Sequence, residues 1–370
     1  MGPVMPLYVS SLGIGVLGWS LLAMSAGVGM FLFEWVWGVL SDKVDRRLLM
    51  AVAFLSMSFL YPLYTLEGFV PYFIVLQFIY GAIGVVMGPT TRAYVSDESP
   101  PKSIGLFVSL WWAFFASGSV VGPLLGTYIA QAWSFRYAFY ASTILSLICV
   151  YLVLTILPKN RKTPRRTDSR DMIGGLKSLL GIRCAVLLFL AAVFAFMGRY
   201  SLRALLPLYA SEQIGMSTVE IGILLSATSV AQLAAMPVLG ILSDRLGRVR
   251  TVLTGFALSS VILLFYFLAK TPFQLILIST VLFVALSSSL LLLAMIPDVA
   301  PNALYGTAVG VYGSSEDLGM IIGPLVLGLV WSSFGPVFIF AATVIIQVLA
   351  AMLVLGMIGN LNQTARQLDG

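Results

Sequence analysis

The chain has 370 residues, of which 59% are hydrophobic and only 10% are charged, and its formal net charge is +6. Soluble domains average about one charged residue in four, so this composition excludes a water-soluble globule and predicts an all-α protein that crosses a lipid bilayer many times. The positive charge therefore does not indicate nucleic-acid binding. Because the chain has no histidine, histidine-based proton relays and most zinc or haem sites are excluded, and we expect no cofactor and no metal.

Eleven hydrophobic spans follow one another along the chain, and each is long enough for a membrane-crossing helix of about 20 residues. An odd number of crossings would place the two termini on opposite sides of the membrane. In chain order the spans cover residues 13–40, 48–66, 72–94, 104–130, 136–157, 184–209, 217–241, 250–269, 274–297, 305–330 and 336–357.

Lysine and arginine are concentrated in alternate connections between these spans. The basic set consists of Lys43, Arg46, Arg47, Lys102, the segment 159–183, Arg245, Arg248, Arg250 and Arg366. The other connections contain only Arg136 and Lys270. The positive-inside rule assigns the basic set to the cytoplasm. We therefore expect a multi-pass protein of the cell membrane with a cytoplasmic C-terminus and with Met1 outside.

The longest polar stretch, residues 159–183, divides the chain into parts of similar size. We interpret it as a basic cytoplasmic linker between an N-terminal half (1–158) and a C-terminal half (184–357), which is followed by a cytoplasmic tail (358–370). The alternative role for the linker is contact with anionic lipid head groups, which basic clusters beside a membrane attract.

The two halves repeat each other at a spacing of about 201 residues. The segment GVLSDKVDRR at 38–47 corresponds to GILSDRLGRVR at 240–250. Farther along, Asp97 corresponds to Asp298, and the pair Gly122-Pro123 corresponds to Gly323-Pro324. A membrane protein made of two parallel repeats is typical of transporters that handle their substrate where the repeats meet.

The first pair of repeated segments resembles the loop motif G-x-L-x-D-x-x-G-R-x of the major facilitator superfamily, which joins the second and third helices of each half. The second copy matches at Gly240, Leu242, Asp244, Gly247 and Arg248. The first copy matches at Gly38, Leu40, Asp42 and Arg46. The resemblance covers essentially the whole chain. It implies the family's fold of two pseudo-repeated six-helix halves, here with eleven full transmembrane helices and a remnant of the first.

In this family, the aspartate and arginine of the motif join an acid at the end of the fourth helix in a cytoplasmic gate. The resemblance implies such a gate at Asp42, Arg46, Asp97, Asp244 and Arg248. Gly247 can adopt a positive φ angle and so permits a tight turn; Asp45, which replaces the usual glycine in the first copy, tolerates that conformation less well. A carboxylate at the C-terminal end of a helix opposes the macrodipole, so Asp42 and Asp244 need cationic partners. The alternative is that these are solvated loop charges.

A second motif, GSVVGPLLG at 118–126, resembles the antiporter motif G-x-x-x-G-P-x-x-G of the family's fifth helix. Its residues are Gly118, Gly122, Pro123 and Gly126. Small residues four apart let helices approach closely, and proline bends a helix, which favours antiport; ordinary helix packing is the alternative. Gln77 stands where the family's fourth helix usually has an arginine, so the proton-coupling role of that arginine does not transfer.

Ionisable residues within the spans are costly in lipid, and each is therefore a candidate functional residue. The candidates for proton coupling are Glu34, Glu316 and Asp317, because a buried carboxylate can take up a proton as a cavity changes sides. The candidates for substrate binding are Arg199, Arg203 and Trp35. The two arginines lie four apart on one helix face, where they can hold an anionic group. The alternative is that acids and arginines pair across helices and hold the bundle closed, with the tryptophan as a packing or interface anchor.

These features predict a secondary transporter and not an enzyme. We expect a small organic solute to leave the cell by alternating access, in exchange for protons. The partners are then the small-molecule substrate, protons and the bilayer, and we expect the chain to act as a monomer. Two alternatives stay open: proton-coupled uptake (symport) of a small solute such as an anion, and a non-transporting membrane sensor or partner subunit.

The repeat also bears on the start of the chain. MPLYVSSLG at 5–13 corresponds to LPLYASEQIG at 206–215, which is the outer end of the first helix of the second half. We therefore expect Met1 to Val9 to be the last part of a first helix. In a complete twelve-helix protein, about 20 to 25 further residues would precede Met1.

Overall fold

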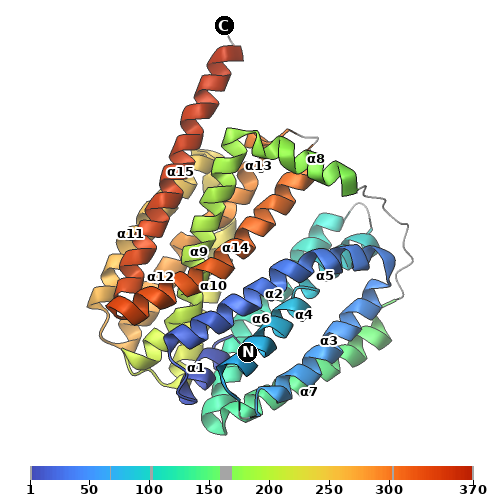
Figure 1. The fold of residues 1–370 in the computed structure, drawn as a ribbon, viewed down its shortest axis with the longest axis vertical. Coiled ribbons are helices and arrows are strands. Elements are labelled where there is room, and N and C mark those ends of the chain that lie inside the picture. The colour runs from blue at the N-terminus through green and yellow to red at the C-terminus, as the bar shows by residue number, and fades with distance from the viewer. Residues whose placement is uncertain (1, 67, 101–102, 159–168, 302–303, 369–370) are drawn as a thin grey trace. The chain divides into compact units, whose positions relative to one another are not determined.

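The computed structural model describes residues 2–66, 68–100, 103–158, 169–301 and 304–368. The regular structure within these ranges is helical (Figure 1). The helices form two compact units. The first unit comprises Met1–Arg166 and Met216–Ser226, and the second comprises Thr167–Gly215 and Ala227–Gly370.

The described residues of the first unit form seven helices and the first turns of α10. The seven are α1 (Val4–Ser11), α2 (Val16–Lys43), α3 (Arg46–Leu63), α4 (Val70–Gly84), α5 (Met87–Glu98), α6 (Ile104–Ala132) and α7 (Phe135–Ile156).

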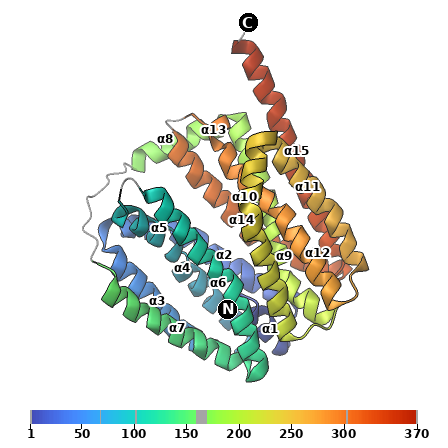
Figure 2. The same cartoon turned by 180° about the vertical axis from the view of Figure 1, so that it is seen from behind.

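The second unit contains the remaining elements, with α11, α12 and α15 side by side in both views (Figures 1 and 2). The α-helices are α8 (Ser169–Leu180), α9 (Arg183–Glu212), α10 (Thr218–Leu246), α11 (Arg248–Leu264), α12 (Pro272–Leu286), α13 (Ile296–Val299), α14 (Tyr305–Phe334) and α15 (Phe338–Leu368). Two 3₁₀ segments, η1 (Phe265–Leu268) and η2 (Ser287–Met295), follow α11 and α12.

Among the residues that the structure describes, ten helical stretches are long and apolar enough to cross a membrane, and they match ten of the eleven spans expected from the sequence. The eleventh, at 72–94, is divided into α4 and α5. Pro89 in the sequence accounts for the break, because proline has no N–H group to donate to the carbonyl of Val85, four residues earlier and just after α4. The indole N–H of Trp37 donates to the carbonyl of Ala82 at 2.6 Å, so α2 satisfies a polar group beside this break.

The second half changes helical form at the corresponding place, 201 residues later. There α12 ends at Leu286 and the chain continues as the 3₁₀ segment η2. The hydroxyls of Ser287, Ser288 and Ser289 donate to carbonyls three or four residues earlier at 2.7–2.8 Å, and such bonds compete with the regular helical ladder. The two halves therefore break the same helix by different means.

Close backbone contacts hold the first unit together. A Cβ atom on Gly81 of α4 would lie 1.9 Å from the carbonyl oxygen of Ala26 in α2, so only glycine permits this crossing. The short helix α1 is fixed by Tyr8, whose hydroxyl donates to the carbonyl of Tyr64 at 2.9 Å. Its ring also meets that of Phe139 edge to face, with centroids 5.1 Å apart, a favourable aromatic arrangement.

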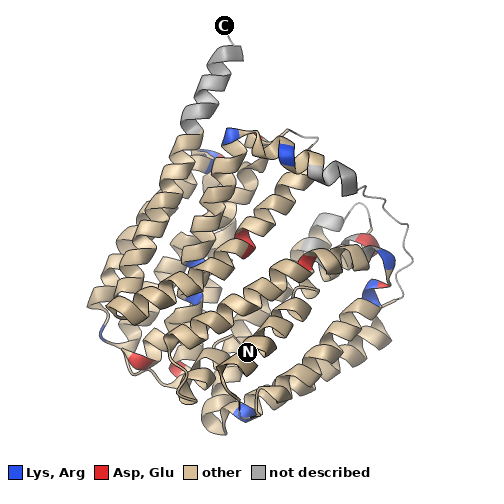
Figure 3. Cartoon of the chain, in the orientation of Figure 1, with Lys and Arg blue, Asp and Glu red and all other residues tan. Residues whose placement is uncertain are grey.

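The second unit has an equally close contact between α9 and α14. A Cβ atom on Gly323 would lie 2.5 Å from the carbonyl oxygen of Met197, and one on Gly319 would lie 2.7 Å from the backbone nitrogen of Met197. These glycines bring the middle of the two helices together. Charged residues gather near helix ends in the described chain, but a few lie at mid-length of α9 and α14 (Figure 3). The contact between α9 and α14 therefore places polar residues of both helices beside one another.

Candidate functional site

An arginine–aspartate pair joins the start of α3 to the end of α5 in the first unit. Arg46 is the first residue of α3, and its guanidinium forms an ion pair with the carboxylate of Asp97. The Arg46 side chain is only 10% exposed, whereas that of Asp97 is 44% exposed. The structure thus brings together two of the residues expected at the gate. The side chain of Asp42 lies outside the part of the chain that the structure describes.

The turn that precedes Arg46 does not use the positive φ that glycine permits. Asp45 has a φ of −56°. The Asp45 carboxylate accepts a hydrogen bond from the backbone N–H of Arg47 at 2.9 Å, which makes Asp45 the N-cap of α3. A capping aspartate needs extended backbone rather than a left-handed turn, and this is why an aspartate can replace the usual glycine.

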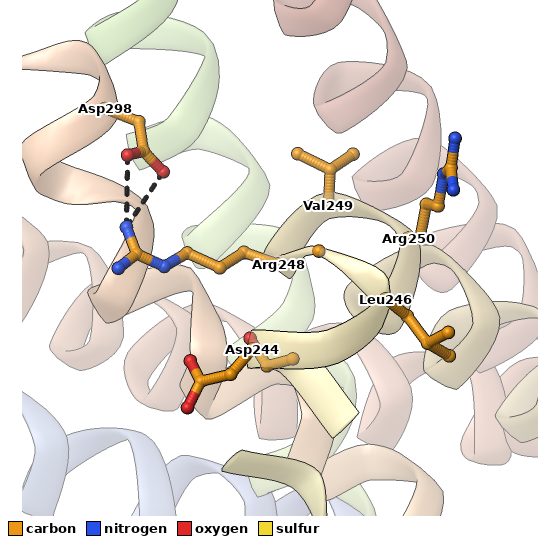
Figure 4. Close-up of a pocket in the computed structure, with 8 residues that line it drawn as sticks. Asp244, Leu246, Arg248, Val249, Arg250 and Asp298 are labelled. Carbon is orange, nitrogen blue, oxygen red and sulfur yellow. Dashed lines mark hydrogen bonds and ion pairs between the residues drawn. The ribbon is translucent and has the colours of Figure 1, made fainter. Parts of the chain in front are cut away.

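The second unit contains the repeat counterpart of this pair. Gly247 has a φ of +92°, which confirms the tight turn expected there. Arg248, the first residue of α11, places Nη1 3.1 Å from both carboxylate oxygens of Asp298 (Figure 4). The side chains of Arg248 and Asp298 are 39% and 46% exposed. Sequence reasoning did not name Asp298 as a gate residue, although the repeat spacing from Asp97 was a sufficient signal.

The surroundings of Arg248 form a shallow cavity of about 510 Å³ at the end of α10. Asp244 lines it but lies on the other side of the Arg248 side chain from Asp298 (Figure 4). Asp244 is exposed, and within the described residues it has neither a hydrogen bond nor an ion pair. In the structure, Arg248 therefore forms its ion pair with Asp298 and not with Asp244.

The glycine-rich motif lies on α6, with Pro123 inside the helix. A Cβ atom on Gly118 or Gly122 would meet no atom within 4 Å, so these two glycines are not needed for close packing within the described structure. The close contact is made one turn later, where a Cβ on Gly222 of α10 would lie 1.9 Å from the Thr127 hydroxyl. Gly126 is also close, since a Cβ there would lie 3.1 Å from Val4.

A hydrogen-bonded acid lies between α9 and α14 in the second unit. The Tyr200 hydroxyl of α9 donates to Oε1 of Glu316 on α14 at 2.5 Å. Asp317 follows and is half-buried, as is Glu316. Tyr200 was not named by the sequence analysis, because a tyrosine within a hydrophobic span carries no signal of its hydrogen-bond partner.

Two arginines lie on α9 beside this acid. Arg199 is half-buried, and its Nη1 atom is enclosed without a hydrogen-bond partner in the described structure. Glu316 is the carboxylate within electrostatic reach of Arg199, but the two do not form an ion pair within the described residues. Arg203, one turn farther along, is exposed and adds a second positive charge to the same helix face.

The remaining candidates belong to the first unit. Glu34 is half-buried and Trp35 is exposed, both on α2. Within the described residues Glu34 has no hydrogen bond or ion pair. Within the second unit, the α9–α14 group brings Arg199, Tyr200 and Glu316 together around one carboxylate.

Comparison with known proteins agrees with this architecture. The family model described as Major Facilitator Superfamily matches residues 1–187 and 188–367. The chain is 26% identical over 363 residues to the multidrug resistance protein MdtG of Escherichia coli, for example of strain K12 / DH10B, an alignment that covers 93% of this chain and 87% of MdtG.

Solved structures of two transporters have a similar fold. A mutant form of the nucleoside transporter NupG superposes with a TM-score of 0.80 at 15% identity, covering 96% of this chain and 94% of NupG. A bacterial homologue of the human lysosomal transporter Spinster, in an inward-facing and occupied conformation, gives a TM-score of 0.76 at 14% identity, covering 96% and 92%. With two family matches that span both halves and a helical fold shared with transporters, this chain belongs to the Major Facilitator Superfamily and is a membrane transporter rather than an enzyme.

Proposed function

We propose that the protein exports small organic solutes in exchange for protons, by alternating access of its two halves. The hydrogen bond between Tyr200 and Glu316 is the observation that carries the proposal, because it identifies an acid held in a defined orientation inside a membrane span. The similarity to a protein named for multidrug resistance supports efflux as the direction and organic compounds as the solute class.

The chemistry of exchange follows from the single negative charge that Glu316 can carry. In a low-dielectric site, a positively charged solute and a proton compete for that charge, since each neutralises it. Binding of the solute then favours release of the proton, and protonation favours release of the solute. Tyr200 keeps the carboxylate directed at one place through both steps.

Several further residues have roles under this proposal. Asp317 and Glu34 are additional proton acceptors, and Arg203 and Trp35 contact the solute. The ion pairs Arg46–Asp97 and Arg248–Asp298 belong to a gate on the cytoplasmic side.

We propose further that the transporter is a monomer in the cell membrane and that its C-terminus is cytoplasmic. A cysteine added after Gly370 should react with an impermeant thiol reagent only in opened cells; labelling of intact cells would contradict this orientation.

One observation favours a second function, the uptake of an organic anion together with a proton. The Nη1 atom of Arg199 is buried without a hydrogen-bond partner in the described structure, and guanidinium groups bind carboxylates and phosphates well. An anion on Arg199 is repelled by ionised Glu316 but not by protonated Glu316. Anion and proton therefore favour each other's binding, which is the thermodynamic requirement for symport.

Reconstituted protein can decide between the two functions. Liposomes containing a pH-sensitive dye would be given ethidium as an organic cation or benzoate as an organic anion, under an imposed pH gradient. Exchange predicts that ethidium and protons move in opposite directions; symport predicts that benzoate and protons move together. Glu316→Gln should reduce the coupled proton flux at least about tenfold, which corresponds to about 1.4 kcal/mol of lost coupling.

Matched variants show which residue carries the coupling. Glu98→Gln, at an exposed acid on α5, is the control and should leave the proton flux unchanged. Asp317→Asn removes the additional acceptor and should reduce the proton flux less than Glu316→Gln does, whereas Arg199→Gln should abolish benzoate movement while leaving ethidium movement within about twofold. If Glu316→Gln leaves the proton flux unchanged for a transported probe, Glu316 is not the coupling residue and the proposal fails.

A further inference from the structure

A short helix in the region between the two halves packs directly on the second unit. Leu179 of α8 is fully buried in the main hydrophobic core of that unit. Gly175, one turn earlier, is also buried, and a Cβ atom on it would lie 3.1 Å from the Thr307 hydroxyl and 3.4 Å from the Leu304 side chain. Gly175 and Leu179 therefore form one face of α8, which is seated against the start of α14 (Figure 1).

A second apolar stripe runs along the same helix. Leu176 is 39% exposed and Leu180 is 56% exposed. Each follows a buried residue by one position, so this stripe is turned by about 100° from the packed face. Gly174 and Ser178 occupy the opposite flank and are exposed, and Lys177 points away from the core. Within its described side chains, α8 therefore has a packed face, an apolar flank, a polar flank and a basic outer edge.

The position of α8 relative to the membrane follows from what comes next in the chain. The membrane-spanning stretch Arg183–Glu212 begins three residues after α8 ends at Leu180, so α8 must lie at the level of the bilayer surface. Arg183 is exposed and adds a second positive charge at the start of α9, six residues after Lys177. A helix with an apolar flank and basic residues, at this depth, has the properties of an interfacial helix.

We propose that α8 lies in the membrane interface, with Leu176 and Leu180 in the acyl region and with Lys177 and Arg183 in contact with the head groups of anionic lipids. Continuity with the adjacent membrane span supports the lipid as the occupant of the apolar flank. The sign of the two charges supports anionic lipids over neutral ones, since basic residues near a membrane surface are attracted by its negative potential. The other half of the protein is the competing occupant, and the experiment separates it from lipid.

The depth of individual α8 positions can be measured in the full-length protein. Cys149 and Cys184 would be replaced by serine, and single cysteines labelled with bimane would be introduced at Leu176, Leu180, Gly174 or Ser178. The protein would be reconstituted in phosphatidylcholine vesicles with one-fifth phosphatidylglycerol. Brominated lipid should quench the labels at 176 and 180 at least about threefold more than those at 174 and 178, and aqueous iodide should show the reverse order.

Lipid charge is tested by placing bromine on only one lipid class. Brominated phosphatidylglycerol should quench the label at 180 more, per mole, than brominated phosphatidylcholine does. One basic residue near the surface contributes about a fivefold preference for anionic lipid, so Lys177→Gln should reduce the ratio by up to about fivefold, whereas Lys177→Arg should retain it.

Two outcomes would overturn the proposal. If lipid quenches positions 176 and 180 no more than 174 and 178, the apolar flank is covered by protein and not by lipid. If the two brominated lipids quench equally, and Lys177→Gln changes nothing, the helix lies in the interface without preference for anionic lipid. Gly175→Leu serves as a packing control, because it should displace α8 from Thr307 and abolish the difference between the flanks.

Discussion

The two arginine–aspartate pairs arise from one repeated sequence but differ in environment. Arg46 is 10% exposed where it meets Asp97, whereas Arg248 is 39% exposed where it meets Asp298. The preceding turns differ as well, since Asp45 caps α3 with its side chain and Gly247 uses a φ of +92°. A repeat therefore preserves which helices are joined, while the local chemistry that joins them is free to diverge.

Burial decides which of the two pairs contributes more to stability. Removal of one partner from a buried pair leaves an uncompensated charge and costs about 3–5 kcal/mol. An exposed pair contributes about 0–1 kcal/mol, because water and salt screen it. We therefore expect the Arg46–Asp97 pair to hold the first unit in one conformation and the Arg248–Asp298 pair to open easily. The following variants test this difference, from the largest expected effect to the smallest.

Removal of Asp97 should have the largest effect. Asp97→Ala leaves the buried guanidinium of Arg46 without this carboxylate, and because Asp97 itself is partly exposed we expect a loss of about 2–3 kcal/mol, below the range for fully buried pairs. The measurement is the temperature at which half of the detergent-solubilised protein remains monodisperse. Arg46→Gln together with Asp97→Ala should recover part of the loss. A double variant less stable than Asp97→Ala would contradict the account based on a buried charge.

Substitution of Gly247 comes second. Gly247→Ala forces a residue with a Cβ atom into a backbone conformation that costs about 1–2 kcal/mol, although a Cβ there would meet no neighbouring atom within 4 Å. The cost is therefore conformational and not steric. Gly247→Asn should be better tolerated than Gly247→Ala, since asparagine visits positive φ more readily. Equal melting temperatures for the two variants would show that the turn can relax.

Loss of the helix cap in the first unit should have a smaller effect. Asp45→Ala removes the acceptor of the Arg47 N–H and should cost about 1 kcal/mol, the usual value for an N-cap. Asp45→Gly, which restores the residue usual in the family, should cost only a few tenths of a kcal/mol, because glycine is itself a tolerable cap. If glycine proved the most stabilising residue, the first turn would use positive φ in solution as the second turn does.

The sequence predicts much of the fold because apolar length and the repeat are local signals. Ten of the eleven expected spans are long helical stretches, and the turn at Gly247 has the φ angle expected of glycine. The break between α4 and α5 could have been predicted from the sequence, since Pro89 disrupts the helix four residues earlier. The N-cap made by Asp45 could not have been predicted, because an aspartate can either adopt a left-handed turn or accept a hydrogen bond.

The candidate site was less predictable because its contacts depend on packing. Glu316 and Arg199 were identified by charge within a span, but Tyr200 becomes the hydrogen-bond partner of Glu316 only because Gly319 and Gly323 bring α14 against α9. Likewise, Arg248 binds Asp298 rather than Asp244, a choice set by the position of α13. Composition indicates which groups are costly in lipid; tertiary structure determines which of them meet.

The exposed pair gives the smallest expected effect and the sharpest contrast. Asp298→Ala removes an acceptor that contacts one guanidinium nitrogen at 3.1 Å through both oxygens, yet both side chains are accessible to water, so we expect a loss of about 0.5 kcal/mol. In 1 M salt, where the screening length falls to about 3 Å, the difference between Asp298→Ala and the unaltered protein should vanish, while the loss in Asp97→Ala should persist. If instead Asp298→Ala matched Asp97→Ala in both conditions, exposure would not distinguish the two pairs, and the second would be as firmly closed as the first. A clear change in the transport rate of Asp298→Ala, despite its small effect on stability, would show that the Arg248–Asp298 pair breaks and re-forms during each transport cycle.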